Sequence, residues 1–214
     1  MEIRAIYIFI LYINMYSTSS FSDLIKNKDK KELVFIHTPK CAGSYIGNIL
    51  SYLKIKNLGH HQAVPNKKYI YFTVIRNPVE RFESLLNYRL SEEKPRIDWP
   101  IYLSYVYHDK YIGLDDIVSK MSNEDILGFT PFKTINYWTK NVDIIIILDN
   151  LPKMLEYFGY KYDVNLFKPV NVSNKTRGTI SQKNKNRIGK LFNDDVELYN
   201  KVVSVNEIIV KRRG

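Results

Sequence analysis

The sequence lacks the residues that would cross-link the chain or hold a structural metal. Its 214 residues include a single cysteine, Cys41, so no intramolecular disulfide can form. Neither this cysteine nor the four histidines fall at the spacings of a zinc site. The chain also has no internal repeat and no low-complexity tract. A chain of this length suits one sizeable domain, so we expect a single hydrophobic core and no metal.

Long apolar runs are missing as well. The N-terminal run from Ala5 to Ile13 has nine residues, whereas a transmembrane helix needs about 20. Its length and the serines after it suit a signal peptide, which would send the protein to the secretory pathway; a buried strand or helix in a cytoplasmic protein is the alternative. We predict a signal or hydrophobic segment at 1–20, able to associate with a membrane, a polar linker at 21–31, and a folded domain at 32–214.

Acidic residues are few relative to basic ones. The chain has 22 Asp and Glu against 32 Lys and Arg, which gives a formal net charge of +10. Such a surface attracts anions, including nucleic acids, acidic glycans, phosphorylated cofactors and anionic membranes. The chain is also rich in Ile, Lys, Asn and Tyr, the residues of AT-rich codons. The net charge alone therefore does not choose among these partners.

The order strand, turn, helix recurs along the chain. Apolar runs predict strands at 33–36, 69–75 and 143–148, and helical spacing predicts helices at 44–53, 79–90 and 151–158. Gly159 is placed to end the last of these helices. Short helices are predicted at 114–121 and 123–127, and one long final helix at 181–210. This alternation predicts an α/β fold, in which helices flank a parallel sheet.

The turn after the first strand, HTPKCAGS (37–44), has features of an anion site. A strand that leads directly into a helix places unpaired N–H groups and the positive helix end together. Lys40 adds a charge, Gly43 permits close approach of the backbone, and Ser44 offers a hydroxyl. A nucleotide-binding P-loop requires its lysine after the second glycine, and here Lys40 precedes Gly43. An ordinary turn with an exposed lysine is the alternative.

The second strand ends in RNPVERFES (76–84), which has features of another anion site. Arg76 leaves the strand, and Pro78 suits the first turn of a helix. Ser84 lies about two helical turns beyond, where its hydroxyl and the curled Arg76 side chain can share one phosphate. Structural roles are expected for Glu80 and Arg81. Because the carboxyl ends of parallel strands meet at one edge of a sheet, we expect the two sites to be neighbours.

Together the two segments resemble the donor-binding motifs of sulfotransferases that use 3′-phosphoadenosine 5′-phosphosulfate (PAPS). FIHTPKCAGSYI resembles their 5′-phosphosulfate loop, and VIRNPVERFES resembles their 3′-phosphate motif. Looser similarity in 142–159 and 171–202 extends the resemblance over about 32–203. It is closest to the carbohydrate branch that includes heparan sulfate 2-O-sulfotransferase, with its compact microbial and viral relatives. This implies a P-loop-like sulfotransferase fold, PAPS as co-substrate, a glycan or glycoconjugate as acceptor, and no nucleic-acid partner.

The resemblance also implies a set of donor-binding residues. They are Pro39, Lys40, Cys41, Ala42, Gly43, Ser44, Tyr45, Arg76 and Ser84, with Arg177 and Gly178 closing over the nucleotide. Lys40 would stabilise charge on the leaving phosphate oxygen. The chain departs from the family pattern at Cys41, where threonine is usual, and at Tyr45, where serine is common.

An acceptor hydroxyl requires a general base, for which histidine is suited near neutral pH. The carbohydrate branch carries its catalytic histidine after the first crossover helix, often behind a glycine. On that resemblance we predict His60 as the base, ahead of His61, with an acidic residue as the alternative. His37 is expected to orient the turn. His108 is expected at the surface, in an aromatic segment from Trp99 to Tyr111 that could stack on sugars.

Two other functions compete with the enzyme. One is a nucleotide- or nucleic-acid-binding module that uses the net charge of +10. It lacks the sequence pattern of a recognition helix or an RNA-binding strand. The other is a non-catalytic relative that binds PAPS only, which loss of a usable base would mark.

Overall fold

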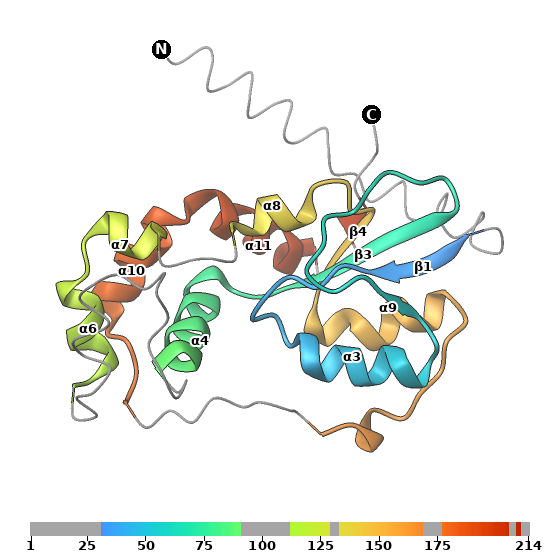
Figure 1. Cartoon of the computed structure of the whole chain (residues 1–214), viewed down its shortest axis with the longest axis horizontal. Helices are drawn as coiled ribbons and strands as arrows, with labels where there is room; N and C mark the ends of the chain where they lie inside the picture. Colours follow the sequence, from blue (N-terminus) through green and yellow to red (C-terminus); the bar gives the residue numbers. More distant parts are fainter. Residues whose placement is uncertain (1–30, 91–111, 129–132, 169–176, 206–208, 211–214) are drawn as a thin grey trace, which may run out of the picture.

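A sheet of four parallel strands forms the centre of the molecule (Figure 1). The computed structural model describes residues 31–90, 112–128, 133–168, 177–205 and 209–210. The predicted N-terminal segment, all but the last residue of the linker, and the aromatic segment with His108 lie outside these ranges. Among the described residues, no helix combines the length and hydrophobicity that a membrane crossing requires.

The strand order in the sheet is β2-β1-β3-β4-β5. The parallel strands are β1 (Glu32–Phe35), β2 (Lys56–Asn57), β3 (Tyr69–Ile75) and β4 (Ile144–Ile147). In register, Phe35 pairs with Phe72, which in turn pairs with Ile144. The predicted α/β fold with helices flanking a parallel sheet is confirmed for these four strands. At the edge, β5 (Ile209–Val210) runs antiparallel to β4.

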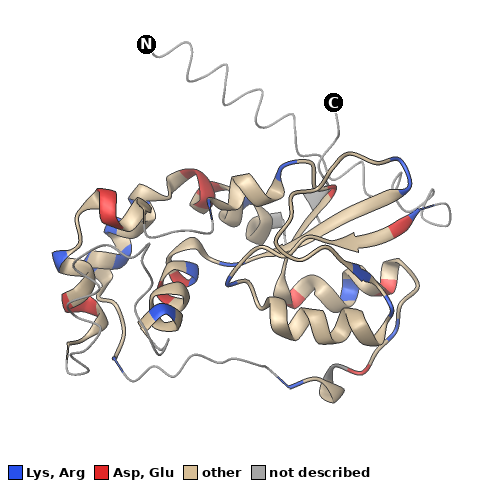
Figure 2. Ribbon diagram, viewed as in Figure 1, with Lys and Arg blue, Asp and Glu red and all other residues tan. Residues whose placement is uncertain are grey.

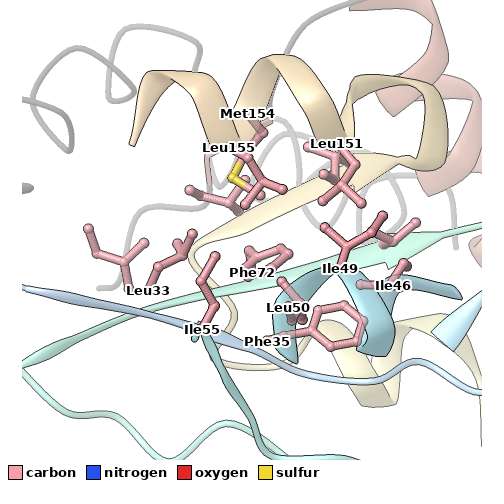
Figure 3. Close-up of a cluster of buried hydrophobic side chains, with 14 residues drawn as sticks. Leu33, Phe35, Ile46, Ile49, Leu50, Ile55, Phe72, Leu151, Met154 and Leu155 are labelled. Carbon is pink, nitrogen blue, oxygen red and sulfur yellow. The ribbon is translucent and has the colours of Figure 1, made fainter. Parts of the chain in front are cut away.

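One face of the sheet is covered by α3 (Gly43–Tyr52) and α9 (Leu151–Tyr157) (Figure 1). Alternate strand residues such as Leu33, Phe35 and Phe72 point into this layer, as the two-residue period of a strand requires. Figure 3 shows them packed against Ile49 and Leu155 from the two helices. The layer fixes α3 directly behind the turn that follows β1.

The other face is covered by α8 (Ile135–Thr139) and α11 (Asn193–Val205). The intervening strand residues, among them Val34 and Ile145, pack here against Ile135 and Leu198. Both faces are therefore apolar, which explains why the central strands are continuous hydrophobic runs.

A second group of helices lies beyond the carboxyl ends of the strands, at the left of Figure 1. It consists of α4 (Pro78–Leu90), α6 (Leu114–Lys120), α7 (Asn123–Gly128) and α10 (Gln182–Leu191). Buried side chains from all four, including Phe82, Ile117, Ile126 and Ile188, form a separate apolar cluster. Short 3-10 turns, η2 (Leu148–Asn150) and η3 (Val164–Leu166), flank α9 in the chain.

The long final helix predicted at 181–210 is wrong. The chain forms α10, turns at Phe192 (φ −108, ψ 36) and continues as α11, and residues 209–210 form β5. The turn lets the Phe192 ring lie 6.4 Å from that of Phe82. It also starts α11 with an Asn and two Asp residues, which are favoured at a helix N-terminus. Strand β2, helix α8 and η3 were missed, because each spans only two to five residues.

Candidate anion-binding site

Two buried threonine hydroxyls anchor the turn between β1 and α3 to the adjacent strand β3. The Thr73 hydroxyl donates to the carbonyl of Ile36 at 2.7 Å, and the Thr38 and Thr73 oxygens lie 2.8 Å apart. Since Thr73 uses its proton on Ile36, Thr38 is the donor in the second bond. Both threonines are fully buried. They tie the start of the turn to the middle of β3.

Arg81 holds the same turn from the side. Its Nε donates to the carbonyl of Pro39 at 3.0 Å, and its Nη2 donates to the carbonyl of Lys133 at 3.1 Å. The side chain is only 7% exposed. The structural role predicted for Arg81 is confirmed, because the guanidinium bonds to backbone carbonyls that shape the turn.

Two residues of the turn adopt the left-handed backbone conformation, which is energetically costly for residues other than glycine. Lys40 has φ 63 and Ala42 has φ 60. A non-glycine residue in the left-handed region costs of order 1–3 kcal/mol, and such strain clusters at ligand sites. Left-handed residues in a tight turn can also aim successive N–H groups at one point, which makes a concavity for an anion. The strain thus falls on the segment that the sequence assigns to anion binding.

The positive end of α3 opens from this turn. Its N-cap is Ala42, whose methyl group cannot accept a hydrogen bond from the first turn of the helix. No acidic residue lies in that first turn, and the ribbon of α3 is tan in Figure 2 because the helix contains no charged residue. The helix therefore supplies no negative charge of its own to its positive end.

The space beside Gly43 is occupied by His37. A Cβ added at Gly43 would lie 1.7 Å from Nε2 of the His37 ring, closer than any contact allows. We expected this glycine to admit a ligand; the structure shows that it admits the imidazole. The pKa of His37 is lowered to about 4, chiefly because burial disfavours its charged form, with smaller effects of His60 and Lys40. His37 is therefore neutral at neutral pH.

The Lys40 side chain extends toward α4. Its Nζ lies 4.1 Å from the centre of the Tyr88 ring, a favourable cation–π distance. Lys40 also lines a cavity of about 10 Å³, which holds no more than one water molecule. The cavity is lined by Lys40, Pro78, Arg81, Phe82, Leu85, Phe192 and Asp195. It is far smaller than a nucleotide, so it is no donor pocket by itself.

The turn between β3 and α4 is short and capped by its own side chains. Asn77 Oδ1 accepts from the backbone N–H of Val79 at 2.9 Å and of Glu80 at 3.4 Å. Pro78 is the first residue of α4, as predicted. Arg76 Nε lies 3.1 Å from Glu80 Oε2, and both side chains are largely exposed. The guanidinium thus has a carboxylate partner within its own turn.

The two turns are neighbours, as the order β1-β3 requires. The Cys41 sulfur donates to the carbonyl of Pro39 at 3.7 Å, and Arg76 lies close enough to the thiol to act on its pKa. Burial raises the pKa of the Cys41 thiol to about 11, so it stays protonated. Cys41 therefore joins the two turns by packing, and only its backbone could face an anion.

His60 lies against the first turn. Its ring stacks on that of His37 with centres 4.2 Å apart, and its Nδ1 lies 3.3 Å from the carbonyl oxygen of His37. The Trp138 ring of α8 meets it edge-on at 6.2 Å. Gln62 Nε2 donates to the carbonyl of Tyr137 at 2.8 Å and ties this segment to α8. His60 and His61, the second candidate, are both exposed, but only His60 stacks on His37.

Helix α8 is the part of this site that the sequence did not reveal. Its first N–H groups, on Ile135 and Asn136, donate to the Asp195 carboxylate at 2.8 and 3.2 Å. Thr134 caps it by accepting from the N–H of Tyr137 at 3.3 Å. A threonine followed by apolar residues at helical spacing was the available signal.

The other residues predicted to bind the donor lie on α4, on α3 and at the start of α6. Ser84 is half-buried on α4, and Tyr45 packs into the core beneath α3. Arg177 Nη1 donates to the carbonyl of Ile112 at 3.4 Å, and its own carbonyl accepts from Leu114 at 2.9 Å. Arg177, and with it the adjacent Gly178, therefore stands at the start of α6.

Within the described residues, no three side chains of His, Cys, Asp or Glu gather as a metal site would require. Comparison with models of protein families, with curated proteins and with solved structures gave no match. The candidate site is therefore defined by its own geometry. It comprises a strained lysine turn, the start of α3, an arginine just after the neighbouring strand β3, and a stacked pair of histidines.

Proposed function

We propose that the chain is a PAPS-dependent sulfotransferase with a P-loop-like fold, which transfers a sulfuryl group to a hydroxyl of a glycan or glycoconjugate. One observation carries the proposal: the strained Lys40 turn and Arg76 follow adjacent parallel strands, and Arg76 lies close enough to Cys41 of that turn to act on the pKa of its thiol. Two cationic sites side by side suit a donor that carries phosphate-type groups at both ends of a nucleoside. The motif resemblance supports the same assignment.

In this reaction the acceptor oxygen attacks sulfur as the bond from sulfur to the 5′-phosphate oxygen breaks. The transition state is loose, and negative charge grows on the leaving oxygen, as in phosphoryl transfer. Lys40 and the N–H groups at the start of α3 would stabilise that charge. His60 would take the proton from the acceptor hydroxyl. The products are the sulfated acceptor and 3′-phosphoadenosine 5′-phosphate.

The remaining predicted residues divide by what they can offer the donor. Pro39, Cys41 and Ala42 would contribute backbone only, because the first two side chains are buried and the third is a methyl group. Ser44 is exposed at the start of α3 and would add a hydroxyl. For Arg76 to bind a phosphate, its guanidinium would have to exchange the Glu80 carboxylate for the ligand.

The test is transfer of labelled sulfate from PAPS to a panel of glycans, lipids and tyrosine peptides. We expect transfer to a glycan, and a loss of about 10²–10³-fold in Lys40→Ala. Lys56→Ala is a matched control, because that lysine also lies over a tyrosine ring, 4.9 Å from the centre of Tyr69, but on β2. Full activity in Lys40→Ala would refute the mechanism. Loss of activity in His61→Ala and not in His60→Ala would reassign the base.

A second candidate is a nucleic-acid-binding module, which a cationic groove favours. An open groove of about 410 Å³ is lined by Asn123, Lys183, Asn186, Arg187, Lys190 and Leu191. Its three cations lie on one face of α10, and no acidic residue lines it. Salt-sensitive binding of RNA or DNA without selectivity for 3′-phosphoadenosine 5′-phosphate would favour this function over the enzyme.

A further inference from the structure

A line of contacts connects the anion-binding turn to the candidate base. The His37 ring sits on the Cα of Gly43, where no side chain would fit. The ring also stacks on the imidazole of His60 with centres 4.2 Å apart, and Trp138 meets that imidazole edge-on. Stacking on one ring and edge contact with another restrict how the His60 ring can rotate.

The hydrogen bond from His60 to the backbone determines its tautomer. Nδ1 lies 3.3 Å from the carbonyl oxygen of His37, and a carbonyl oxygen can only accept. In this bond the proton of neutral His60 is therefore on Nδ1, and the lone pair is on Nε2. Free histidine in water prefers the other tautomer, so the contact works against the intrinsic preference of the ring.

We propose that His37 is a positioning residue for the base: its carbonyl fixes the His60 proton on Nδ1, so that Nε2 is the atom that takes the proton of the acceptor. This assignment deepens the proposed function and rests on it. When Nε2 is protonated, the bond from Nδ1 becomes charge-assisted and shortens. His37 touches no reacting atom and acts only through His60.

The His37 ring can perform this role because it stays uncharged. Two imidazolium rings at 4.2 Å would repel each other, which would oppose protonation of His60. Lys40 from the same turn and His60 from the segment after β2 are the charged and titratable groups that act on His37, and both disfavour its protonation. A neutral neighbour thus leaves His60 able to accept a proton.

The test is the tautomer of His60, read from the nitrogen shifts of its ring by NMR in the full-length protein without donor. Signals are assigned with His61→Gln and His108→Gln variants. We expect the native chain to carry the proton on Nδ1, with the exposed His61 showing the ordinary preference. His37→Ala keeps the backbone carbonyl but removes the ring that stacks on His60 and aims its Nδ1 at that carbonyl, and Gly43→Ala displaces the ring. In both variants His60 should therefore return toward the ordinary tautomer, whereas His37→Phe, which keeps an aromatic ring for the stack, should preserve the native signature.

A His60 proton on Nε2 in the native chain would overturn the proposal. So would a tautomer that stays unchanged in both His37→Ala and Gly43→Ala, and if one of these fails to fold the other decides. The result is separable from the proposed function. If the protein transfers sulfate but His60 has the other tautomer, only the positioning role of His37 is refuted. If His60 has the expected tautomer but no sulfate is transferred, only the proposed enzymatic function is refuted.

Discussion

The turns after β1 and β3 start at neighbouring strand ends, yet they differ in how they cap the helices that follow them. The first has two left-handed non-glycine residues and leads into α3 through Ala42, which has no capping side chain. The second is short, caps α4 with Asn77, and pairs Arg76 with Glu80. The first turn therefore holds backbone strain and starts its helix without a side-chain cap from Ala42, while the second caps its helix with Asn77 and pairs Arg76 with its own Glu80.

Under the proposed function, this difference predicts separate roles for the two turns in binding one donor. An anion on the first turn would offset strain already present in the backbone, whereas an anion on the second must displace a carboxylate. Preorganised donors are most effective where charge develops during the reaction. The comparison therefore assigns transition-state stabilisation to the first turn and donor binding to the second.

The largest expected effect separates the two turns kinetically. Lys40→Ala should lower kcat for sulfate transfer by about 10²–10³-fold, because it removes charge where the leaving oxygen forms. Arg76→Ala should instead raise KM for PAPS, by about 10-fold, because it removes a binding contact. Steady-state kinetics on the best acceptor measures both. Equal effects of the two variants on kcat would show that the two turns do not have separate roles in transition-state stabilisation and donor binding.

The glycine of the first turn offers a test by stability. Gly43→Ala should destabilise the protein by about 1–3 kcal/mol, because the new methyl group would lie 1.7 Å from the His37 ring. Gly47→Ala is the matched control in the same helix, where the nearest atom is 3.7 Å away. That variant should be stabilised by about 0.5–1 kcal/mol. Urea unfolding measures both, and a neutral Gly43→Ala would contradict the packing.

The neutral His37 predicts a pH dependence that belongs to the first turn. Its pKa is about 4 in the folded chain against 6.5 ordinarily. Between these values the unfolded chain binds a proton that the folded chain does not, so stability falls as pH drops through this window. Above it, this group has no effect. The loss should be about 1–2 kcal/mol, reduced by solvent at the partly exposed ring.

The variant His37→Gln isolates this contribution. It cannot titrate, so its stability should fall less than that of the native chain between neutral pH and about pH 4. The raised pKa of Asp195 acts in the opposite direction, but it is common to both proteins and cancels in the difference. If stability falls equally with pH in the two proteins, folding does not lower the pKa of His37.

The cap of the second turn sets a smaller effect. Asn77→Ala should cost about 1 kcal/mol, since it removes the acceptor for the N–H groups of Val79 and Glu80. Asn77→Asp keeps an acceptor and adds negative charge at the helix N-terminus, so it should retain full stability. Thermal unfolding of both variants is the measurement. A large loss of stability in Asn77→Asp would mean that a nearby negative charge repels the new carboxylate.

Much of the fold could be predicted, because the central strands are buried on both faces and their sequences are continuous apolar runs. The strands at 69–75 and 143–148 and the helices behind them follow from this pattern. The single helix at 181–210 failed for a physical reason. Helical periodicity persists across Phe192, whereas the turn there brings its ring against Phe82, a contact distant in sequence. Short elements such as α8 depend on tertiary contacts that no local pattern records.

The candidate site could be predicted by its residue types and not by its contacts. Lys40 and Arg76 follow neighbouring strands as expected. The occupation of the Gly43 space by His37 depends on a contact across the turn, and no spacing rule predicts it. The placement of His60 beside Trp138 depends on α8. The pairing of Arg76 with Glu80 was likewise unforeseen, although the two lie four residues apart.

That ion pair gives the smallest expected effect. Glu80→Gln should tighten binding of 3′-phosphoadenosine 5′-phosphate by up to about fivefold at low salt, because the carboxylate competes with phosphate for Arg76. The field of Glu80 also reaches Tyr199 and contributes, after burial, to raising its pKa. Calorimetric titration at two salt concentrations measures the gain, which should shrink as salt screens the exposed pair. Glu156→Gln, at an exposed position of α9, controls for the change in net charge. Weaker binding in Glu80→Gln would mean that Glu80 orients Arg76 for the donor, and the second turn would then be as preorganised as the first.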